Sequence, residues 1–276
     1  MAEDSVQLAS VNDTALEYED SGTGEPIVFI HGALIADTFR LLVAQRSLAA
    51  RHRLISYHRQ GYVESSGVSG RITVARQAAD CLSVLQHLGL ESAHVVGHSY
   101  GGCIALQLAL DVPEVVRSLV LLEPALILGS TAQSYRESLA HASARHQDEP
   151  AEILVDEFLQ ARWPGYRGAL DKILPGAFAQ AVADAETAFE TDLPGLLEWS
   201  FGEDEVRQIS QPVLSVLGAK SDALWPRFGE IHELLLAWLP HAEGVIVPNS
   251  THFLPLENSR TMAEVLASFL ARRLAS

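Results

Sequence analysis

The sequence predicts an α/β fold with a doubly wound, mostly parallel sheet and an inserted helical cap. Two patterns support this prediction. Up to about residue 128, uniformly apolar runs alternate with runs of helical periodicity, an order typical of a parallel sheet covered by helices on both faces. Between about residues 129 and 209 only helical patterns occur, and a strand pattern resumes after 210. We therefore expect a core domain from residues 1–128 and 210–276 and a cap from residues 129–209.

The first half of the core alternates between predicted strands and predicted helices. The run at 27–30 is Ile-Val-Phe-Ile, and a strand without polar residues suits the interior of a parallel sheet. The helix at 72–88 stops at Gly89, a frequent residue at helix C-termini. In chain order, strands are expected at 14–19, as an edge strand, and at 27–30, 53–57, 93–97 and 116–122, and helices at 38–50, 72–88 and 102–110.

The predicted cap contains helical patterns without an intervening strand. Residues 134–146, 151–162 and 177–190 have helical periodicity, and prolines separate these segments. A plain extension of the core's helical layer is the alternative to a cap. After this segment, strands are expected at 213–217 and 244–247, a loop at 248–253, and helices at 228–238 and 259–273.

The charge balance excludes some classes of partner. The chain has 35 acidic residues against 19 Lys and Arg, a net charge of -16, which repels phosphate backbones and anionic lipids. We therefore expect a small-molecule substrate and neither nucleic acid nor a membrane as a partner. The acidic start Met1-Ala2-Glu3-Asp4 is followed by no long apolar run, which predicts a cytoplasmic protein without a signal peptide or transmembrane helix.

No cofactor or metal is expected from the sequence. Cys81 and Cys103 fall in predicted helices without metal-ligand spacing, so we expect reduced packing residues. The histidines form no ligand cluster, and Gly22-Thr23-Gly24 lacks the strand and helix that flank a nucleotide-binding loop.

The segment Gly97-His98-Ser99-Tyr100-Gly101 is the strongest indication of chemistry. It lies between the apolar run at 93–97 and the helical run at 102–110. Gly-x-Ser-x-Gly in this setting places the serine on a tight turn above the sheet, and the N-terminus of the following helix stabilises negative charge there. Because a serine hydroxyl needs a base and a group that orients the base, we expect both elsewhere in the chain.

Two further segments accompany this turn, His31-Gly32 after the strand at 27–30 and Ser250-Thr251-His252 after the last predicted strand. With them, the chain from about Ile27 onward resembles the α/β-hydrolase fold superfamily, in which serine, acid and histidine follow in that order. The resemblance implies that Ser99 is the nucleophile and His252 the base. A serine at this position departs from the haloalkane dehalogenases and epoxide hydrolases of the superfamily, whose nucleophile is a carboxylate.

The acid of the triad has two candidates. In many relatives it stands three residues after the glycine that here is Gly218, but that position is Ser221 and Asp222 comes one residue later. Glu123 ends the apolar strand before the cap, where a charged side chain is costly unless it is paired or functional. Some superfamily members, including the zearalenone-lactone hydrolases, which this chain resembles in the spacing from serine to glutamate, take the acid from that strand. We favour Glu123 over Asp222.

The resemblance also implies how the oxyanion and one nearby loop are built. The N–H groups of Ala33 and Tyr100 are expected to bind the oxyanion, and Gly32 lets the chain approach the substrate. The loop at 58–65 resembles the Asp-x-x-Gly-x-Gly-x-Ser loop of the superfamily, with His58 in place of the aspartate and Val63 in place of a glycine. We expect a structural role for His58.

The substrate pocket is expected to take its apolar walls mainly from cap aromatics, of which about half pack in the cap's own core. The candidates are Gly32, Leu126, Ile127, Trp163, Tyr166, Phe178, Trp199 and Trp225.

These residues predict a serine hydrolase that cleaves ester or lactone bonds of a small, largely apolar substrate through an acyl-enzyme. The same triad would also serve carbon–carbon bond hydrolysis, a haloperoxidase or perhydrolase reaction, or acyl transfer. A ligand receptor of the same fold is the alternative that is not an enzyme.

Overall fold

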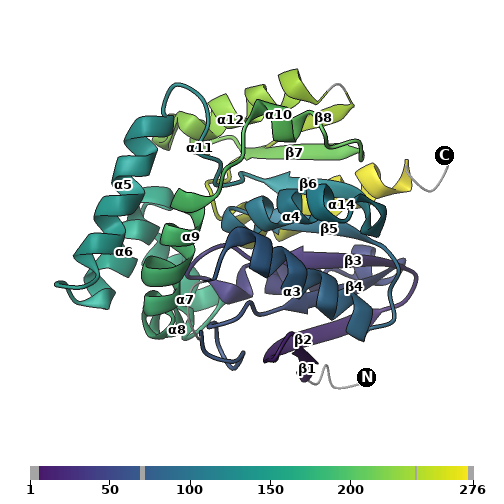
Figure 1. The fold of residues 1–276 in the computed structure, drawn as a ribbon, viewed down its shortest axis with the longest axis horizontal. Coiled ribbons are helices and arrows are strands. Elements are labelled where there is room, and N and C mark those ends of the chain that lie inside the picture. The colour runs from purple at the N-terminus through teal and green to yellow at the C-terminus, as the bar shows by residue number, and fades with distance from the viewer. Residues whose placement is uncertain (1–5, 69–71, 240, 273–276) are drawn as a thin grey trace.

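The computed structural model describes residues 6–68, 72–239 and 241–272, and within them eight strands form one sheet (Figure 1). Its order is β1-β2-β4-β3-β5-β6-β7-β8. The pairs β1 with β2 and β2 with β4 are antiparallel, and the remaining pairs are parallel. The predicted doubly wound, mostly parallel sheet is therefore confirmed. The strands are β1 (Gln7–Val11), β2 (Thr14–Gly22), β3 (Glu25–Ile30), β4 (His52–Tyr57), β5 (Ala93–His98), β6 (Val116–Leu122), β7 (Val213–Gly218) and β8 (Ala242–Val247).

Both faces of the sheet are covered by helices, as the uniformly apolar runs require. In β3, Val28 and Ile30 belong to the core on one face, whereas Ile27 and Phe29 belong to the core on the other. Because neighbouring residues of a strand point to opposite faces, each apolar run contributes to both cores. The first face is covered mainly by α3 (Val74–His87), α4 (Tyr100–Asp111) and α12 (Arg227–Trp238), and the second by α1 (Arg40–Val43), α2 (Arg46–Ala49), α13 (Leu254–Glu257) and α14 (Ser259–Ala271).

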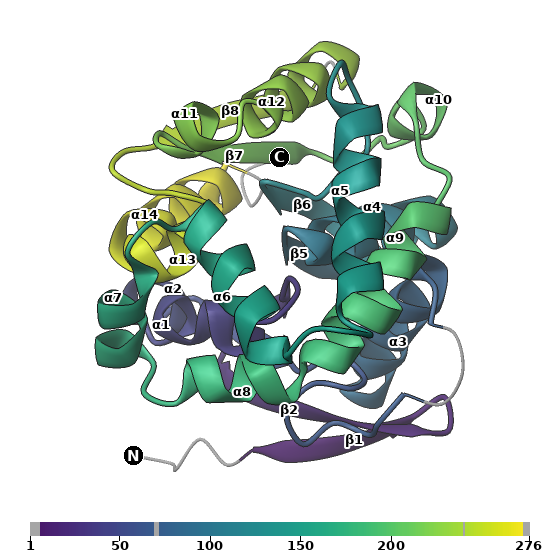
Figure 2. The same cartoon turned by 90° about the vertical axis from the view of Figure 1, so that its left-hand side faces the viewer.

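Residues 129–209, called here the helical insertion, contain no strand within the described chain. Its helices stand beside the end of the sheet at which β6 finishes, and Figure 2 looks onto that end through them. The insertion therefore lies over the strand ends from which the loops predicted to be functional emerge. Its helices are α5 (Ala132–Arg145), α6 (Ala151–Arg162), α7 (Tyr166–Ile173), α8 (Ala177–Ala183), the π-helix η3 (Thr187–Asp192), α9 (Leu193–Glu198) and α10 (Glu203–Val206).

The strand expected at 14–19 exists, but its placement at the edge of the sheet is wrong. It extends to Gly22 as β2 and lies between β1 and β4. The edge strand is β1, where only Ala9 and Val11 are buried and Leu8 is 59% exposed. A short strand that buries so few apolar side chains has a weak sequence pattern.

The helix expected at 38–50 is broken into the 3-10 helix η1 (Ala36–Phe39), α1 and α2. The break lies at Gln45, which is extended with φ −74° and ψ 116°, and its side-chain amide donates to the Leu41 carbonyl at 3.0 Å. The helix expected at 177–190 is likewise divided into α8 and η3. The sequence pattern also did not predict α7, α9, α10, α13 or α11 (Ser221–Leu224).

The sequence led to expectations about the two cysteines, possible metal ligands and possible membrane-spanning helices. Cys81 and Cys103 are buried, free thiols, as predicted. Within residues 6–68, 72–239 and 241–272, no cluster of His, Cys, Asp and Glu could hold a metal ion, and none of the helices there has the length and apolar character needed to span a bilayer.

Candidate active site

Ser99 occupies a strained turn between β5 and α4. Its backbone has φ 53° and ψ −119°, a conformation that residues with a side chain adopt at a cost. A Cβ atom on Gly97 would lie 2.4 Å from the Gly101 carbonyl oxygen, and a Cβ atom on Gly101 would lie 2.0 Å from the Ile30 carbonyl oxygen. Gly97 is therefore required for β5 to turn closely into α4, and Gly101 for the turn to pack against the end of β3.

The backbone of Ser99 is held firmly while its hydroxyl is left unused. The N–H of Ser99 donates to the Leu122 carbonyl at 2.9 Å, and its carbonyl accepts from the Ala125 N–H at 3.0 Å. Ser99 is 8% exposed. Its hydroxyl forms no hydrogen bond within the described part of the chain, and it is not among the fully buried atoms that lack a partner. The hydroxyl therefore retains some accessible surface and is free to form a new hydrogen bond.

His252 and Glu123 form a buried pair at the same end of the sheet. The Nδ1 atom of His252 lies 2.7 Å from Oε2 of Glu123, and the two residues are 2% and 3% exposed. The other carboxylate oxygen accepts from the Gly218 N–H at 2.7 Å. Because Nδ1 faces the carboxylate, it carries the proton, and Nε2 is left as the acceptor of a neutral ring.

Burial shifts the pKa values of Glu123 and His252 in opposite directions. It raises the pKa of Glu123 to about 7, against the effects of the Ser221 hydroxyl and the Gly218 N–H. It lowers the pKa of His252 well below the usual value, and the charges of Arg162 and Arg227 add to that effect. A neutral imidazole at neutral pH suits a general base.

His98 connects the serine turn to the loop of His252. Its Nε2 donates to the His252 carbonyl at 2.8 Å, and the two rings lie 4.7 Å apart. Ser99 and His252 are thus on adjoining segments, although no hydrogen bond joins the Ser99 hydroxyl to His252 among the described residues. Bonds of this kind are often long in unliganded enzymes and shorten when substrate binds.

Asp222, the other candidate acid, lies elsewhere. It is an exposed residue of α11, and its carboxylate lies against Gly229 of α12, where an added Cβ atom would meet it at 2.2 Å. Ser221, at the usual position of the acid, is buried. Of the two candidates, the structure brings Glu123 to His252.

The predicted oxyanion donors flank Ser99. Tyr100 is the first residue of α4, so its N–H has no acceptor within that helix. Gly32 lies so close that an added Cβ atom would be 3.0 Å from the Ser99 Cβ atom, which places the Ala33 segment beside the serine. Ala33 is half-buried, and its N–H makes no hydrogen bond in the described structure.

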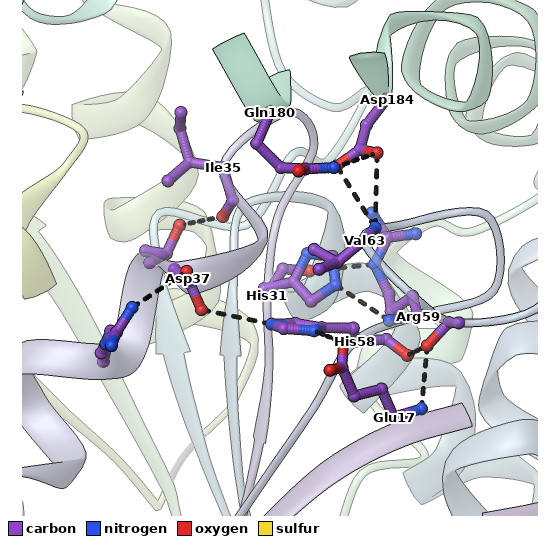
Figure 3. Close-up of polar contacts among 12 residues, drawn as sticks. Glu17, His31, Ile35, Asp37, His58, Arg59, Val63, Gln180 and Asp184 are labelled. Atoms are coloured by element: carbon purple, nitrogen blue, oxygen red, sulfur yellow. Dashed lines mark hydrogen bonds and ion pairs between the residues drawn. The ribbon is translucent and has the colours of Figure 1, made fainter. Parts of the chain in front are cut away.

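His58 bridges two carboxylates (Figure 3). Its Nδ1 lies 2.6 Å from Oε2 of Glu17, and its Nε2 lies 3.2 Å from Oδ1 of Asp37. Burial opposes the charged form of His58, but the hydrogen bonds to Asp37 and Glu17 outweigh burial and raise its pKa. Both ring nitrogens are occupied, so His58 joins β2, β4 and η1 and is not available as a base for Ser99.

Val63, the other departure in this loop, is held in a left-handed conformation with φ 52°. Its N–H donates to the carboxylate of Asp184, from the insertion, at 3.3 Å (Figure 3). Gln180 donates to the same carboxylate at 2.9 Å. The insertion therefore supplies the acceptor that fixes a backbone conformation usually reserved for glycine.

Some of the pocket candidates pack inside the insertion or against the core. Tyr166 is fully buried, and its ring lies 6.2 Å from that of Phe178. Trp163 packs 5.7 Å from the ring of Phe253, next to His252. These contacts hold α6, α7 and α8 together and place Trp163 near the base.

The remaining candidates line hollows. One hollow of about 160 Å³ is lined by Leu126, Ile127 and Trp199. The indole N–H of Trp199 donates to the side-chain oxygen of Gln107 at 2.6 Å. Trp225 lines two adjoining hollows, one of about 250 Å³ between α5, α6 and η3 and another of about 280 Å³.

Sequence reasoning missed Arg162 and Arg227, which act on the charge of His252. The buried face of α6 contains Leu154, Val155 and Leu159, and Arg162 lies on the same face at the end of the helix. A cation on the buried face of an amphipathic helix is the signal that could have identified Arg162. Arg227 stands at the start of α12 without such a pattern.

Comparisons with known proteins agree with the fold. A family model described as the alpha/beta hydrolase family matches residues 27–267. Among solved structures, a thermophilic esterase from Thermogutta terrifontis superposes with a TM-score of 0.82 at 21% identity, covering 98% of this chain and 99% of that chain. At this identity the likeness concerns the fold.

Two curated relatives have between a quarter and a third of aligned residues identical to this chain. A dihydrolipoyllysine-residue acetyltransferase component of the acetoin cleaving system from Cupriavidus necator is 32% identical over 190 residues, 68% of this chain but 50% of that protein. The chain thus spans about half the length of that relative. A 2-hydroxymuconate semialdehyde hydrolase from Pseudomonas putida is 26% identical over 276 residues, 91% of this chain and 89% of that protein.

Proposed function

The chain belongs to the alpha/beta hydrolase family, and we propose that it is a serine hydrolase that cleaves carboxylic ester or lactone bonds of small molecules. The observation that carries the proposal is the buried pair of His252 and Glu123, 2.7 Å apart, beside the strained Ser99. These are the three groups that nucleophilic catalysis by serine needs: a nucleophile, a base and a group that orients the base.

The reaction begins when the Ser99 hydroxyl attacks the substrate carbonyl. Nε2 of His252 accepts the hydroxyl proton, and the Glu123 carboxylate stabilises the imidazolium through Nδ1. The N–H groups of Ala33 and Tyr100 donate to the oxyanion, and a donor of this kind typically contributes about 3 kcal/mol. His252 then protonates the leaving alcohol, which leaves an acyl group on Ser99.

Water completes the cycle. His252 accepts a proton from a water molecule that attacks the acyl-enzyme, and the acid is released as Ser99 recovers its proton. Alkoxides leave more readily than amide nitrogens, which favours esters and lactones as substrates. The aromatic residues of the insertion supply apolar walls for the body of the substrate.

The test is hydrolysis of 4-nitrophenyl butyrate by the purified protein. The wild type should hydrolyse this ester, and Ser99→Ala should reduce kcat by at least about 10³-fold because the nucleophile is lost. Ser268→Ala, on the outer helix α14, is the control and should leave kcat unchanged. A fluorophosphonate should label the wild type and not Ser99→Ala. Full activity of Ser99→Ala would contradict the proposal.

Carbon–carbon bond hydrolysis is the second candidate, because the relative from Pseudomonas putida, named as a 2-hydroxymuconate semialdehyde hydrolase, aligns with 91% of this chain. Product analysis with a vinylogous 1,5-diketone acid separates the two. Turnover of that compound at a higher kcat/KM than esters would favour the second candidate.

A further inference from the structure

Arg162 and Arg227 are buried cations without a carboxylate partner. Arg162 ends α6 and is 8% exposed, and Arg227 begins α12 and is 4% exposed. Buried Arg59, by contrast, pairs with Asp192 at 2.7 Å. No ion pair joins Arg162 or Arg227 to an acid of the described chain. Each guanidinium group donates to one main-chain carbonyl, Arg162 to Phe158 at 3.0 Å and Arg227 to Leu126, but a carbonyl carries no counter-charge. A buried charge that is not neutralised destabilises a protein, so two of them in one place indicate a role outside folding.

The carboxylates that act on Arg227 from a distance bind other donors. Burial lowers the pKa of Arg227, and the charges of Glu123 and Glu230 are among the effects that oppose this shift. Glu123, however, accepts from the Gly218 N–H and from His252. Glu230 accepts from the Ser130 N–H at 2.5 Å and from Thr131. Neither acid therefore uses the guanidinium donors.

Aromatic rings hold the two guanidinium groups in place. The central carbon of Arg162 lies 3.5 Å from the Phe158 ring centre and 4.7 Å from that of Trp225, and the central carbon of Arg227 lies 3.4 Å from that of Tyr135. A ring contacts the face of a guanidinium group and leaves its N–H edge for hydrogen bonds, of which the carbonyls of Phe158 and Leu126 use one donor on each arginine. Accordingly, Nε and Nη1 of Arg227 are buried without any hydrogen-bond partner.

The pair lies between the hollows of the insertion and the catalytic base. Arg162 lines the hollow of about 250 Å³, Arg227 lines that of about 280 Å³, and Trp225 lines both. Neither hollow reaches Ser99 directly. On the side of His252, the central guanidinium carbon of Arg227 lies 5.2 Å from the ring centre of Phe228. The Phe228 ring stacks on the His252 ring, with 4.6 Å between the ring centres.

We propose that Arg162 and Arg227 bind a carboxylate of the substrate, so that the ester or lactone cleaved at Ser99 carries an anionic group away from the scissile bond. Guanidinium groups offer parallel N–H donors that match the two oxygens of a carboxylate. The inference rests on the proposed function, and it replaces a largely apolar substrate by one with an apolar body and one charged end.

Matched ester pairs test the preference. On the acyl side, mono-4-nitrophenyl glutarate is compared with neutral 4-nitrophenyl valerate, and on the alcohol side 4-acetoxybenzoate with its methyl ester. The wild type should prefer the anionic member of at least one pair by about tenfold or more in kcat/KM. The favoured pair identifies the side of the bond that carries the charge. Hydrolysis of all four esters without a preference for either anion would overturn the inference.

Variants connect the preference to the two residues. Arg162→Met and Arg227→Met keep an apolar stem and should abolish the preference, measured as the ratio of kcat/KM for the anionic ester to kcat/KM for its neutral counterpart. Arg162→Lys should keep part of it. Arg167→Met is the matched control, because Arg167 lies in the same insertion and stacks 3.5 Å from the ring of Phe178 but is exposed and paired with Asp156. An unchanged preference in both Met variants would exclude the two arginines.

A binding measurement separates this inference from the proposed function. Glutarate should raise the Tm of the wild type and of Ser99→Ala, but not that of Arg162→Met or Arg227→Met. If no ester is hydrolysed and glutarate still stabilises the protein in this pattern, the function fails while the carboxylate site stands. Equal shifts in all variants, or a shift with inorganic phosphate and none with glutarate, would refute the site.

Discussion

At the residue scale, Glu123 compensates for the serine at position 221. Glu123 directly follows β6, which lies beside β7, so the side chain of Glu123 reaches the Gly218 N–H at the end of β7. Glu123 has φ 44°, a backbone conformation that is strained for any residue other than glycine. Strain of this kind persists where the surrounding structure imposes it and is concentrated at functional sites. The carboxylate thus reaches His252 from the end of β6, and not from the loop that follows β7.

Neutral substitutions at the two acids test this assignment. Glu123→Gln should lower kcat for 4-nitrophenyl butyrate by about 10³ to 10⁴-fold, because an amide neither fixes the tautomer of His252 nor stabilises the imidazolium. Asp222→Asn should stay within about threefold of the wild type, since an exposed side chain away from His252 does not take part. Equal mild losses in the two variants would mean that the third group lies elsewhere.

The residues of the site differed in how far the sequence could predict them. Ser99, His252 and Glu123 each follow a predicted strand, and the resemblance to the superfamily implied that Ser99 and His252 act together. Arg162 and Arg227 come from α6 and α12, 65 positions apart by their numbers, and only the packing of those helices brings them near His252. The hydrogen bond from His98 to the His252 carbonyl could not be predicted from the neighbours of His98 in the chain.

At the element scale, the insertion is fixed to the core by a buried ion pair. Asp192, at the end of η3, faces both terminal nitrogens of Arg59 at 2.7 and 2.8 Å. Tyr62 donates to the same carboxylate at 2.6 Å. Arg59 also donates to the carbonyls of His31 and Gly32, at 3.2 and 2.9 Å. The contact therefore joins the insertion to the segment that carries Ala33.

Removing one member of this pair should destabilise the protein strongly. Asp192→Asn leaves the buried Arg59 without its counter-charge, at a cost of about 3 to 5 kcal/mol in the free energy of unfolding. Asp20→Asn should cost about 1 kcal/mol or less, because its pair with Arg53 is partly exposed. Urea denaturation followed by circular dichroism measures both. A loss for Asp192→Asn no larger than that for Asp20→Asn would show that this contact does not hold the insertion.

The elements that the sequence predicted well are those with a strong local pattern. The runs that became β3, β5, β6 and β7 are buried almost throughout, so most of their residues are apolar. The elements that the sequence did not predict depend on contacts with residues far away in the chain. The π-helix η3 interrupts a helical pattern where Asp192 meets Arg59, and the break at Gln45 separates α1 from α2 where both pack on α14.

At the scale of the whole molecule, the two proposed anion-binding residues lie within a strongly acidic protein. The net charge is -16, so an anionic substrate approaches against a repulsive field. Repulsion from exposed acids acts over long distances and is screened by salt, whereas attraction to buried arginines acts at short range and is screened much less. The two effects should therefore separate when ionic strength is varied.

Raising NaCl from about 10 to 150 mM shortens the screening length from about 30 to 8 Å. The kcat/KM of the wild type for mono-4-nitrophenyl glutarate should then rise several-fold, because the global repulsion weakens while the contact with Arg162 and Arg227 remains. For neutral 4-nitrophenyl valerate the change should be smaller than about twofold, since no long-range force acts on it. A fall with salt for the glutarate ester alone would contradict this account, because the attraction would then extend into the solvent and dominate the approach of the substrate.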